Sequence, residues 1–151
     1  MKKFTFSLLL IYLLIAGCDY QPLYSSKNLK NFSLDNIEFN ENSEINDLLN
    51  NSLRRYQINE SDNSYNVLIN SDYKKIEREK DSSGKITQFE IIINVRFELF
   101  NKDRKDNFEF TESTLMQSYS NKIEEQQYER SIKSNMVRNI VNKFELKIRN
   151  F

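Results

Sequence analysis

The 151-residue sequence contains no histidine and no tryptophan, and it has only one cysteine, one proline and two glycines. Without histidine, the chain lacks the commonest general base and the commonest metal ligand of proteins. A single cysteine cannot form a disulfide within the chain, so the fold must be stabilised by its hydrophobic core. We therefore expect no catalytic site, no metal and no cofactor. An enzyme would have to use a carboxylate or a Ser/Lys mechanism.

The first 16 residues combine a basic start with a short apolar run. Lys2 and Lys3 precede 13 apolar or small residues, Phe4 to Ala16. A transmembrane helix needs about 20 apolar residues, so this run is too short to cross a bilayer. Its length and its basic start are typical of a secretory signal peptide.

The only cysteine follows this run directly, in the sequence Ile15-Ala16-Gly17-Cys18. This pattern resembles the bacterial lipobox, in which the cysteine thiol is linked to a diacylglycerol and becomes the new N-terminus. We expect a lipoprotein signal peptide at residues 1–17, a lipidated tether at 18–31 and a single domain at 32–151. The alternative is an ordinary cleaved signal in which Cys18 has no role. Lipidation at Cys18 would anchor the chain to a membrane.

The charge balance gives no sign of a nucleic-acid partner. The sequence has 22 basic and 22 acidic residues, and removal of Lys2 and Lys3 with the signal leaves a net charge of about −2. Nucleic-acid-binding domains normally carry a strongly basic surface. We therefore expect the partners to be proteins, lipids or both.

The remaining sequence predicts one α+β domain, with two helices packed on one face of a four-stranded mixed sheet in the order β-α-β-β-β-α. The expected strands are 32–39, 65–80, 87–100 and 108–120, and the expected helices lie within 42–57 and 124–149. The slipped alternation of the first strand predicts a β-bulge near Asp35 and Asn36. A hairpin is expected around Gly84, and a charged loop at 101–107.

Two patterns define the expected core. Strand 87–100 alternates between an apolar face and a mostly polar face. Its apolar positions are Phe89, Ile91, Ile93, Val95, Phe97 and Leu99. In the last helix, large residues recur every four positions and predict its buried face. They are Tyr128, Ile132, Met136, Ile140, Phe144 and Ile148, joined by Val137 and Val141. The first helix should bury Ile45, Leu48, Leu49, Ser52 and Tyr56, with Asn42 or Ser43 as its N-cap.

The residues after the lipobox cysteine carry a specific resemblance. Cys18, Tyr20, Pro22, Leu23 and Tyr24 are similar to the start of the LPS-assembly lipoprotein family, LptE, in its alphaproteobacterial form. The resemblance implies an outer-membrane lipoprotein without enzymatic activity. It would plug the LptD β-barrel, help that barrel assemble and bind lipopolysaccharide during its transport.

Asp19 leaves the choice of membrane open. In enteric bacteria, an aspartate directly after the lipidated cysteine resembles the signal that retains a lipoprotein in the inner membrane. The alternative function is therefore a periplasm-facing lipoprotein of the inner membrane that acts as a scaffold or assembly factor.

One basic cluster is a candidate for glycolipid binding. Lys74, Lys75 and Arg78 precede the expected hairpin, and lysine and arginine form charge-assisted hydrogen bonds with phosphate. Glu77 and Glu79 interrupt the cluster, so a solvated strand end is the competing interpretation.

Three further features have ordinary explanations that we prefer. Lys102, Arg104 and Lys105 alternate with acidic residues, as expected of a solvated loop. Glu124 and Glu125 fit the start of a helix, where acidic residues interact favourably with the helix dipole. Aromatic residues on the strands could line a groove for acyl chains, but an ordinary core is the simpler interpretation.

Overall fold

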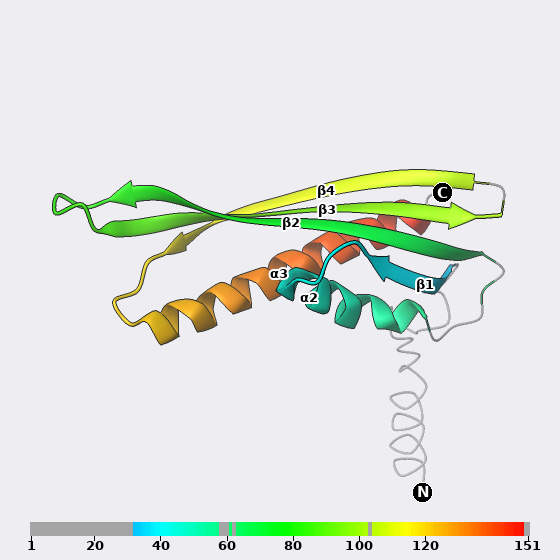
Figure 1. Cartoon of the computed structure of the whole chain (residues 1–151), viewed down its shortest axis with the longest axis horizontal. Coiled ribbons are helices and arrows are strands. Elements are labelled where there is room, and N and C mark those ends of the chain that lie inside the picture. The colour runs from blue at the N-terminus through cyan, green and yellow to red at the C-terminus, as the bar shows by residue number, and fades with distance from the viewer. Residues whose placement is uncertain (1–31, 58–60, 62, 103, 150–151) are drawn as a thin grey trace, which may run out of the picture.

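The computed structural model describes residues 32–57, 61, 63–102 and 104–149. The expected signal peptide, Cys18 and the tether lie outside these residues. The elements are β1 (Ser33–Phe39), α2 (Glu44–Leu53), a 3₁₀ turn (Arg54–Tyr56), β2 (Ser64–Lys80), β3 (Ile86–Asn101), β4 (Arg104–Gln117) and α3 (Lys122–Arg149). Both helices lie on the same face of the sheet (Figure 1). The predicted α+β class and the element order are confirmed.

The four strands form one mixed sheet in the order β1-β2-β3-β4. The pair β1–β2 is parallel, and the pairs β2–β3 and β3–β4 are antiparallel. The predicted bulge is confirmed, because the β1 register shifts between Leu34 and Asn36. Strand β1 pairs only with Ser64–Ile69 of the 17-residue strand β2. The rest of β2 continues with β3 into a long hairpin, which reaches beyond both helices in Figure 1.

The hairpin turn depends on its glycine and on an aspartate. Gly84 has a φ of 81°, in the left-handed region that glycine adopts without strain. The Asp81 carboxylate accepts hydrogen bonds from the backbone N–H groups of Ser83 at 2.9 Å and Lys85 at 3.0 Å. These bonds replace strand pairing at the point where the chain reverses direction.

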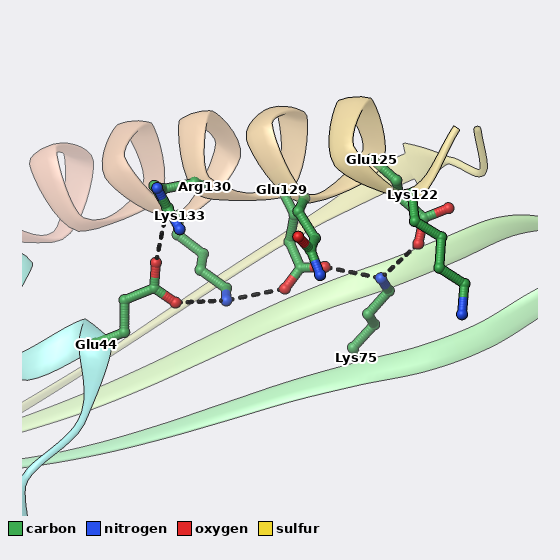
Figure 2. A pocket seen from close by; sticks show the side chains of 8 residues that line it. Glu44, Lys75, Lys122, Glu125, Glu129, Arg130 and Lys133 are labelled. Atoms are coloured by element: carbon green, nitrogen blue, oxygen red, sulfur yellow. Dashed lines mark hydrogen bonds and ion pairs between the residues drawn. The ribbon is translucent and has the colours of Figure 1, made fainter. Parts of the chain in front are cut away.

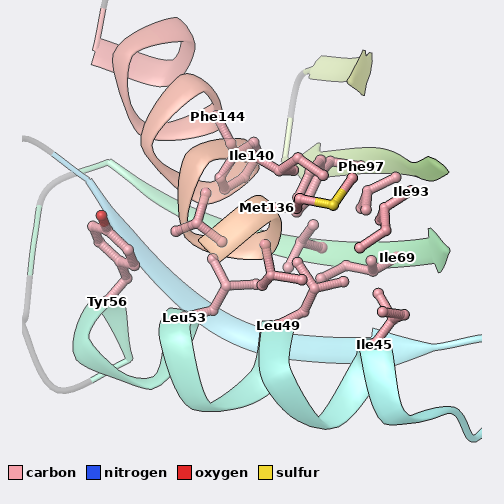
Figure 3. Close-up of a cluster of buried hydrophobic side chains, with 14 of the residues drawn as sticks. Ile45, Leu49, Leu53, Tyr56, Ile69, Ile93, Phe97, Met136, Ile140 and Phe144 are labelled. Carbon is pink, nitrogen blue, oxygen red and sulfur yellow. The ribbon is translucent and has the colours of Figure 1, made fainter. Parts of the chain in front are cut away.

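The core lies between the sheet and the two helices (Figure 3). The apolar face of β3 is buried as predicted, with Phe89 only half-buried at its end. Phe97 of β3 stacks on Phe144 of α3 with the ring centroids 4.1 Å apart and the ring planes 18° apart. This stack joins the middle of the sheet to the last turns of α3.

Helix α2 begins as predicted but buries a slightly different face. The Ser43 side chain caps it by accepting a hydrogen bond from the Asn46 N–H at 3.1 Å. Ile45, Leu49 and Leu53 are buried at four-residue spacing. The prediction that Ser52 is buried is wrong. Ser52 is only half-buried, and its hydroxyl donates to the Leu48 carbonyl at 2.9 Å. Leu53 is the side chain that fills the core.

The buried face of α3 is shorter than predicted. It includes Met136, Val137, Ile140, Val141, Phe144 and Ile148. The prediction that Tyr128 lies in the core is wrong, because its side chain is 41% exposed. A four-residue spacing gains about 40° per step on a helix of 3.6 residues per turn, so the stripe winds away from the sheet. Tyr128 instead packs edge-on against Tyr119, with the ring centroids 5.4 Å apart.

The charged loop predicted at 101–107 is also wrong. Strand β3 continues to Asn101 and β4 begins at Arg104, so the strands are joined by a tight turn. Phe100 lies opposite Lys105 and Glu98 opposite Asn107 in the register. Charged residues are tolerated in this part of β4 because it is an edge strand. Oppositely charged side chains on the neighbouring strand β3 can also pair with them. The Lys105 ammonium lies 3.3 Å from the Glu98 carboxylate.

Candidate functional site

A charged groove of about 480 Å³ opens between β2 and the N-terminal half of α3 (Figure 2). At this position α3 extends past the apolar core, and β1 and α2 no longer cover the side of β2. The groove is lined by Glu44, Lys75, Lys122, Glu125, Gln126, Glu129, Arg130 and Lys133. Glu44 comes from the start of α2, Lys75 from β2 and the other six residues from α3.

Six of these side chains form a row of alternating charge. Glu129 accepts from Lys75 at 2.7 Å and from Lys133 at 2.8 Å. At one end of the row, Lys75 also reaches Glu125 at 3.0 Å. At the other end, Lys133 lies 2.9 Å from Glu44, whose second oxygen lies 3.5 Å from the Arg130 guanidinium. The row therefore ties β2, α2 and α3 together.

Aromatic rings support the two lysines. The Lys75 ammonium lies 4.2 Å from the centroid of the Phe89 ring, and the Lys133 ammonium lies 4.2 Å from that of Tyr73. The Tyr73 hydroxyl donates to Glu129 at 2.7 Å. The Lys133 side chain is only 11% exposed. A lysine can be buried this deeply because its charge is matched by carboxylates and by the ring face.

The contacts of the row shift the pKa values of Glu129, Lys75 and Lys133 toward their charged forms. Burial alone would raise the pKa of Glu129, but hydrogen bonds from Lys133, Lys75 and Tyr73 lower it to about 2. Burial opposes the charged forms of Lys75 and Lys133, but hydrogen bonds to the glutamates outweigh it and raise both lysine pKa values. Burial and the bond to Glu129 raise the pKa of the Tyr73 phenol.

The row is suited to holding α3 in place and not to acid–base chemistry. A general acid or base needs a pKa close to the working pH, whereas the pKa values of Glu129, Lys75 and Lys133 are shifted toward the charged forms. Glu125 accepts from Ser118 and from the Tyr119 N–H, both at 3.1 Å, and Glu124 accepts from Asn121 at 3.2 Å. Both acids lie in the first turn of α3, as expected. Among the described residues, no group of three or more acidic, histidine or cysteine side chains could hold a metal ion.

The three cations singled out in the sequence do not form one patch. Lys75 points toward α3, whereas Lys74 and Arg78 lie on the opposite, helix-free face, because successive strand residues alternate. Lys74 lies 3.1 Å from Asp72, and the Arg78 Nε donates to Glu90 at 2.6 Å. Glycolipid binding by these residues stays a prediction. Arg104 and Lys105 lie in β4, with Lys102 in the turn before it.

The sequence reasoning missed the central members of the row. One available signal was the spacing of Glu129 and Lys133, since oppositely charged residues four apart on a helix are neighbours. The contribution of Glu44 depends on how α2 packs against α3, and no local pattern contains that information. None of the helices in the described part of the chain is long and apolar enough to cross a membrane.

Comparison with known proteins gives one family match and several structural neighbours. A family model described as "LptE: Lipopolysaccharide-assembly" matches residues 29–148. No match is found among curated proteins.

The solved structures share the fold at low sequence identity. A rare lipoprotein B from Shewanella oneidensis has a TM-score of 0.58 at 12% identity, covering 78% of this chain and 97% of that one. A lipoprotein B from Nitrosomonas europaea has a TM-score of 0.52 at 14% identity, covering 78% and 81%. A minor lipoprotein from Acinetobacter baumannii has a TM-score of 0.51 at 14% identity, covering 79% and 94%. At these identities the likeness shows the fold alone.

Proposed function

The chain belongs to the LptE family of lipopolysaccharide-assembly proteins, and we propose that it is an outer-membrane lipoprotein that plugs the LptD β-barrel. In this role it helps the barrel assemble and binds lipopolysaccharide during its transport. The role is one of binding and not of catalysis. In this proposal, residues 1–17 are removed, Cys18 carries the lipid and residues 18–31 connect the lipid to the domain.

The observation that best supports the plug is the polar, helix-free face of the sheet. Arg96 of β3 and Glu109 of β4 are 3.1 Å apart, and Glu109 also accepts from Asn94 at 2.8 Å. Further along, the Ser113 hydroxyl donates to Glu90 at 2.7 Å. Wide membrane barrels have polar lumens. This face is mostly polar, although Ile76 and Leu115 are exposed on it, and its polar side chains can lie against a lumen wall.

The same face carries the two cations that we propose for glycolipid phosphates. The Lys74–Asp72 pair is well exposed on both sides, with side chains 63% and 60% exposed. Exposed pairs of this kind contribute little stability, so a phosphate can replace Asp72 at small cost. Arg78 is half exposed beside Glu90. Lys75 is held in the groove by Glu125 and Glu129, so we assign it to the fold.

The barrel part of the proposal is tested by co-purification. The tagged full chain should co-purify with LptD from detergent-solubilised envelopes of its own host. The control is an unrelated lipoprotein with the same tag, expressed at the same level. Absence of LptD from the eluate of the tagged chain would refute the plug.

The glycolipid part is tested by titrating purified lipopolysaccharide against the full chain in detergent. A Lys74→Glu/Arg78→Glu variant should bind more weakly, and wild-type binding should weaken with salt, because exposed charges are screened. Lys105→Glu is the matched control, since Lys105 is also paired across the sheet but lies near the other end. Equal binding by the double variant and the wild type would exclude Lys74 and Arg78.

Asp19 supports the second candidate function, a scaffold lipoprotein of the inner membrane. Membrane fractionation separates the two. The proposed function places the chain with outer-membrane markers, and an Asp19→Gly variant should not change its location. Wild-type protein in the inner membrane that moves to the outer membrane in the variant would favour the scaffold.

A further inference from the structure

Among the described residues, no strand pairs with one edge of β2 over most of its length. The last backbone hydrogen bond on the β1 side runs from the Asn40 N–H to the Ile69 carbonyl at 3.2 Å. The chain then turns into α2, and among the described residues no strand pairs with this side of β2 beyond Ile69. The open edge runs along the mouth of the charged groove that contains Lys75.

The direction of the free backbone groups follows from the register. In an antiparallel pair, alternate residues direct both backbone groups toward the same neighbouring strand. The Ile69 carbonyl points toward the β1 side, and the β2 register shows no shift between Asn66 and Glu77. Tyr73, Lys75 and Glu77 therefore present their N–H and C=O groups to the open side. None of the three forms a backbone hydrogen bond outside the sheet ladders in the described part of the chain.

The groove wall beneath this edge carries an excess of positive charge. Four cations face three carboxylates among the lining residues. Lys122 has no carboxylate within 4 Å among the residues that the structure describes, and the Arg130 side chain is 74% exposed. A segment lying along the edge would place every second side chain over this wall, where acidic groups are favoured.

We propose that an extended, acidic segment of the barrel partner adds to the open edge of β2 as a further strand. The inference rests on the proposed function and names the contact that joins the two proteins. The segment lies beside β2 where β1 would continue beyond Phe39. It forms hydrogen bonds with the backbone N–H and C=O groups of Tyr73, Lys75 and Glu77. Strand addition of this kind gives affinity through backbone hydrogen bonds and specificity through alternate side chains. The bulge after Glu77 sets its far limit.

The lysines of the edge favour an acidic partner segment over a second copy of the chain as the occupant. The open stretch carries four cations, Lys74, Lys75, Arg78 and Lys80, against three acids, Asp72, Glu77 and Glu79, and lysines on an edge strand disfavour pairing with a like strand. An acidic segment gains from the same charges. Pairing between two copies is thus an outcome that the test must be able to detect.

The direct test is hydrogen exchange of the full chain, alone and in the co-purified complex with LptD. The amides of Tyr73, Lys75 and Glu77 should exchange quickly in the free chain and slowly in the complex. The amides of the intervening residues, which bond to β3, should be slow in both. Those amides also report whether each variant keeps its sheet.

Two variants test the contact through affinity. Glu77→Pro removes an edge N–H, whereas the control Glu77→Ala removes only the side chain, whose partner is the exposed Lys80. The proline variant should bind LptD about tenfold more weakly than the alanine variant, because it loses backbone hydrogen bonds. Lys122→Glu/Arg130→Glu should weaken binding without a substitution in β2.

The outcomes separate the two proposals. Failure of the wild type to form any complex would refute the proposed function and this inference with it. A complex in which the three amides still exchange quickly, or in which the proline and alanine variants bind equally, would refute only the strand addition. Protection that appears in the free chain and rises with its concentration would show self-pairing and would also overturn the inference.

Discussion

Ile140 is a sensitive test of how α3 is held against the sheet. It is fully buried, and it lies on the side of α3 that faces the strands, near Met136 and Phe144 (Figure 3). Ile140→Ala removes three carbon atoms from a position that is closed on all sides. Ile140 belongs to one buried cluster with Met136, Phe144 and the apolar face of β3, so the space that remains can collapse only in part.

The expected loss is large compared with the stability of the domain. Truncation of a buried isoleucine to alanine destabilises proteins by about 2–5 kcal/mol, out of a typical 5–15 kcal/mol. For a domain of this size, that corresponds to a fall of roughly 6–20 °C in the melting temperature. Thermal unfolding followed by circular dichroism measures it.

Leu146 provides the matched control on the same helix. Its side chain is 61% exposed, so Leu146→Ala should change the free energy of unfolding by no more than about 0.5 kcal/mol. If the Ile140 and Leu146 variants melt together, the assigned face of α3 is wrong and Ile140 lies at a surface.

Three further predictions concern other parts of the chain. Because the pKa of Glu129 is lowered to about 2, its stabilising effect is complete above pH ~4.5 and is lost as the pH falls toward 2. Glu129→Gln should therefore destabilise the protein at pH 7 by about 1–3 kcal/mol. The urea midpoint of the variant should also change less with pH between pH 5 and 2.5 than that of the wild type. The same pH dependence in both proteins would mean that the Lys75 and Lys133 contacts do not form. Ser43→Ala should lower the free energy of unfolding by about 1 kcal/mol through loss of the α2 cap, and a change near zero in urea titration would contradict the cap. Cys18→Ala should abolish palmitate labelling in cells, and retained label would refute lipidation at this residue.

The parts of the fold that were predictable are those with a strong period. The alternation of β3 from Phe89 to Leu99 indicated both its extent and its buried face, because a strand with one face in the core must repeat every two residues. The broken alternation of β1 placed its bulge for the same reason. The Ser43 cap followed from a short-range hydrogen bond, which depends only on neighbouring residues.

The errors arose where the outcome depended on distant packing. The four-residue stripe of α3 continues to Tyr128, but the layer that could bury it ends earlier. The charges of 101–107 indicated a loop, although an edge strand with partners such as Glu98 accommodates them. In the candidate site, Glu44 and Glu129 are 85 positions apart and share Lys133 only because α2 packs on α3. The alternating row could not be derived from local patterns.

The order of the strands has a consequence for how the chain folds. Strands β2, β3 and β4 are sequential neighbours joined by short turns. Their contacts can therefore form early in folding, because closing a short loop costs little chain entropy. Strand β1 pairs in parallel with β2 across the intervening α2, and α3 docks on β3, β4 and α2, of which α2 is far from it in the sequence. We expect the three-stranded meander to form the folding nucleus. Substitutions in β3 such as Ile93→Val should then slow refolding, whereas Ile148→Val at the end of α3 should mainly speed unfolding. Stopped-flow kinetics with the reverse pattern would place the nucleus at the helices.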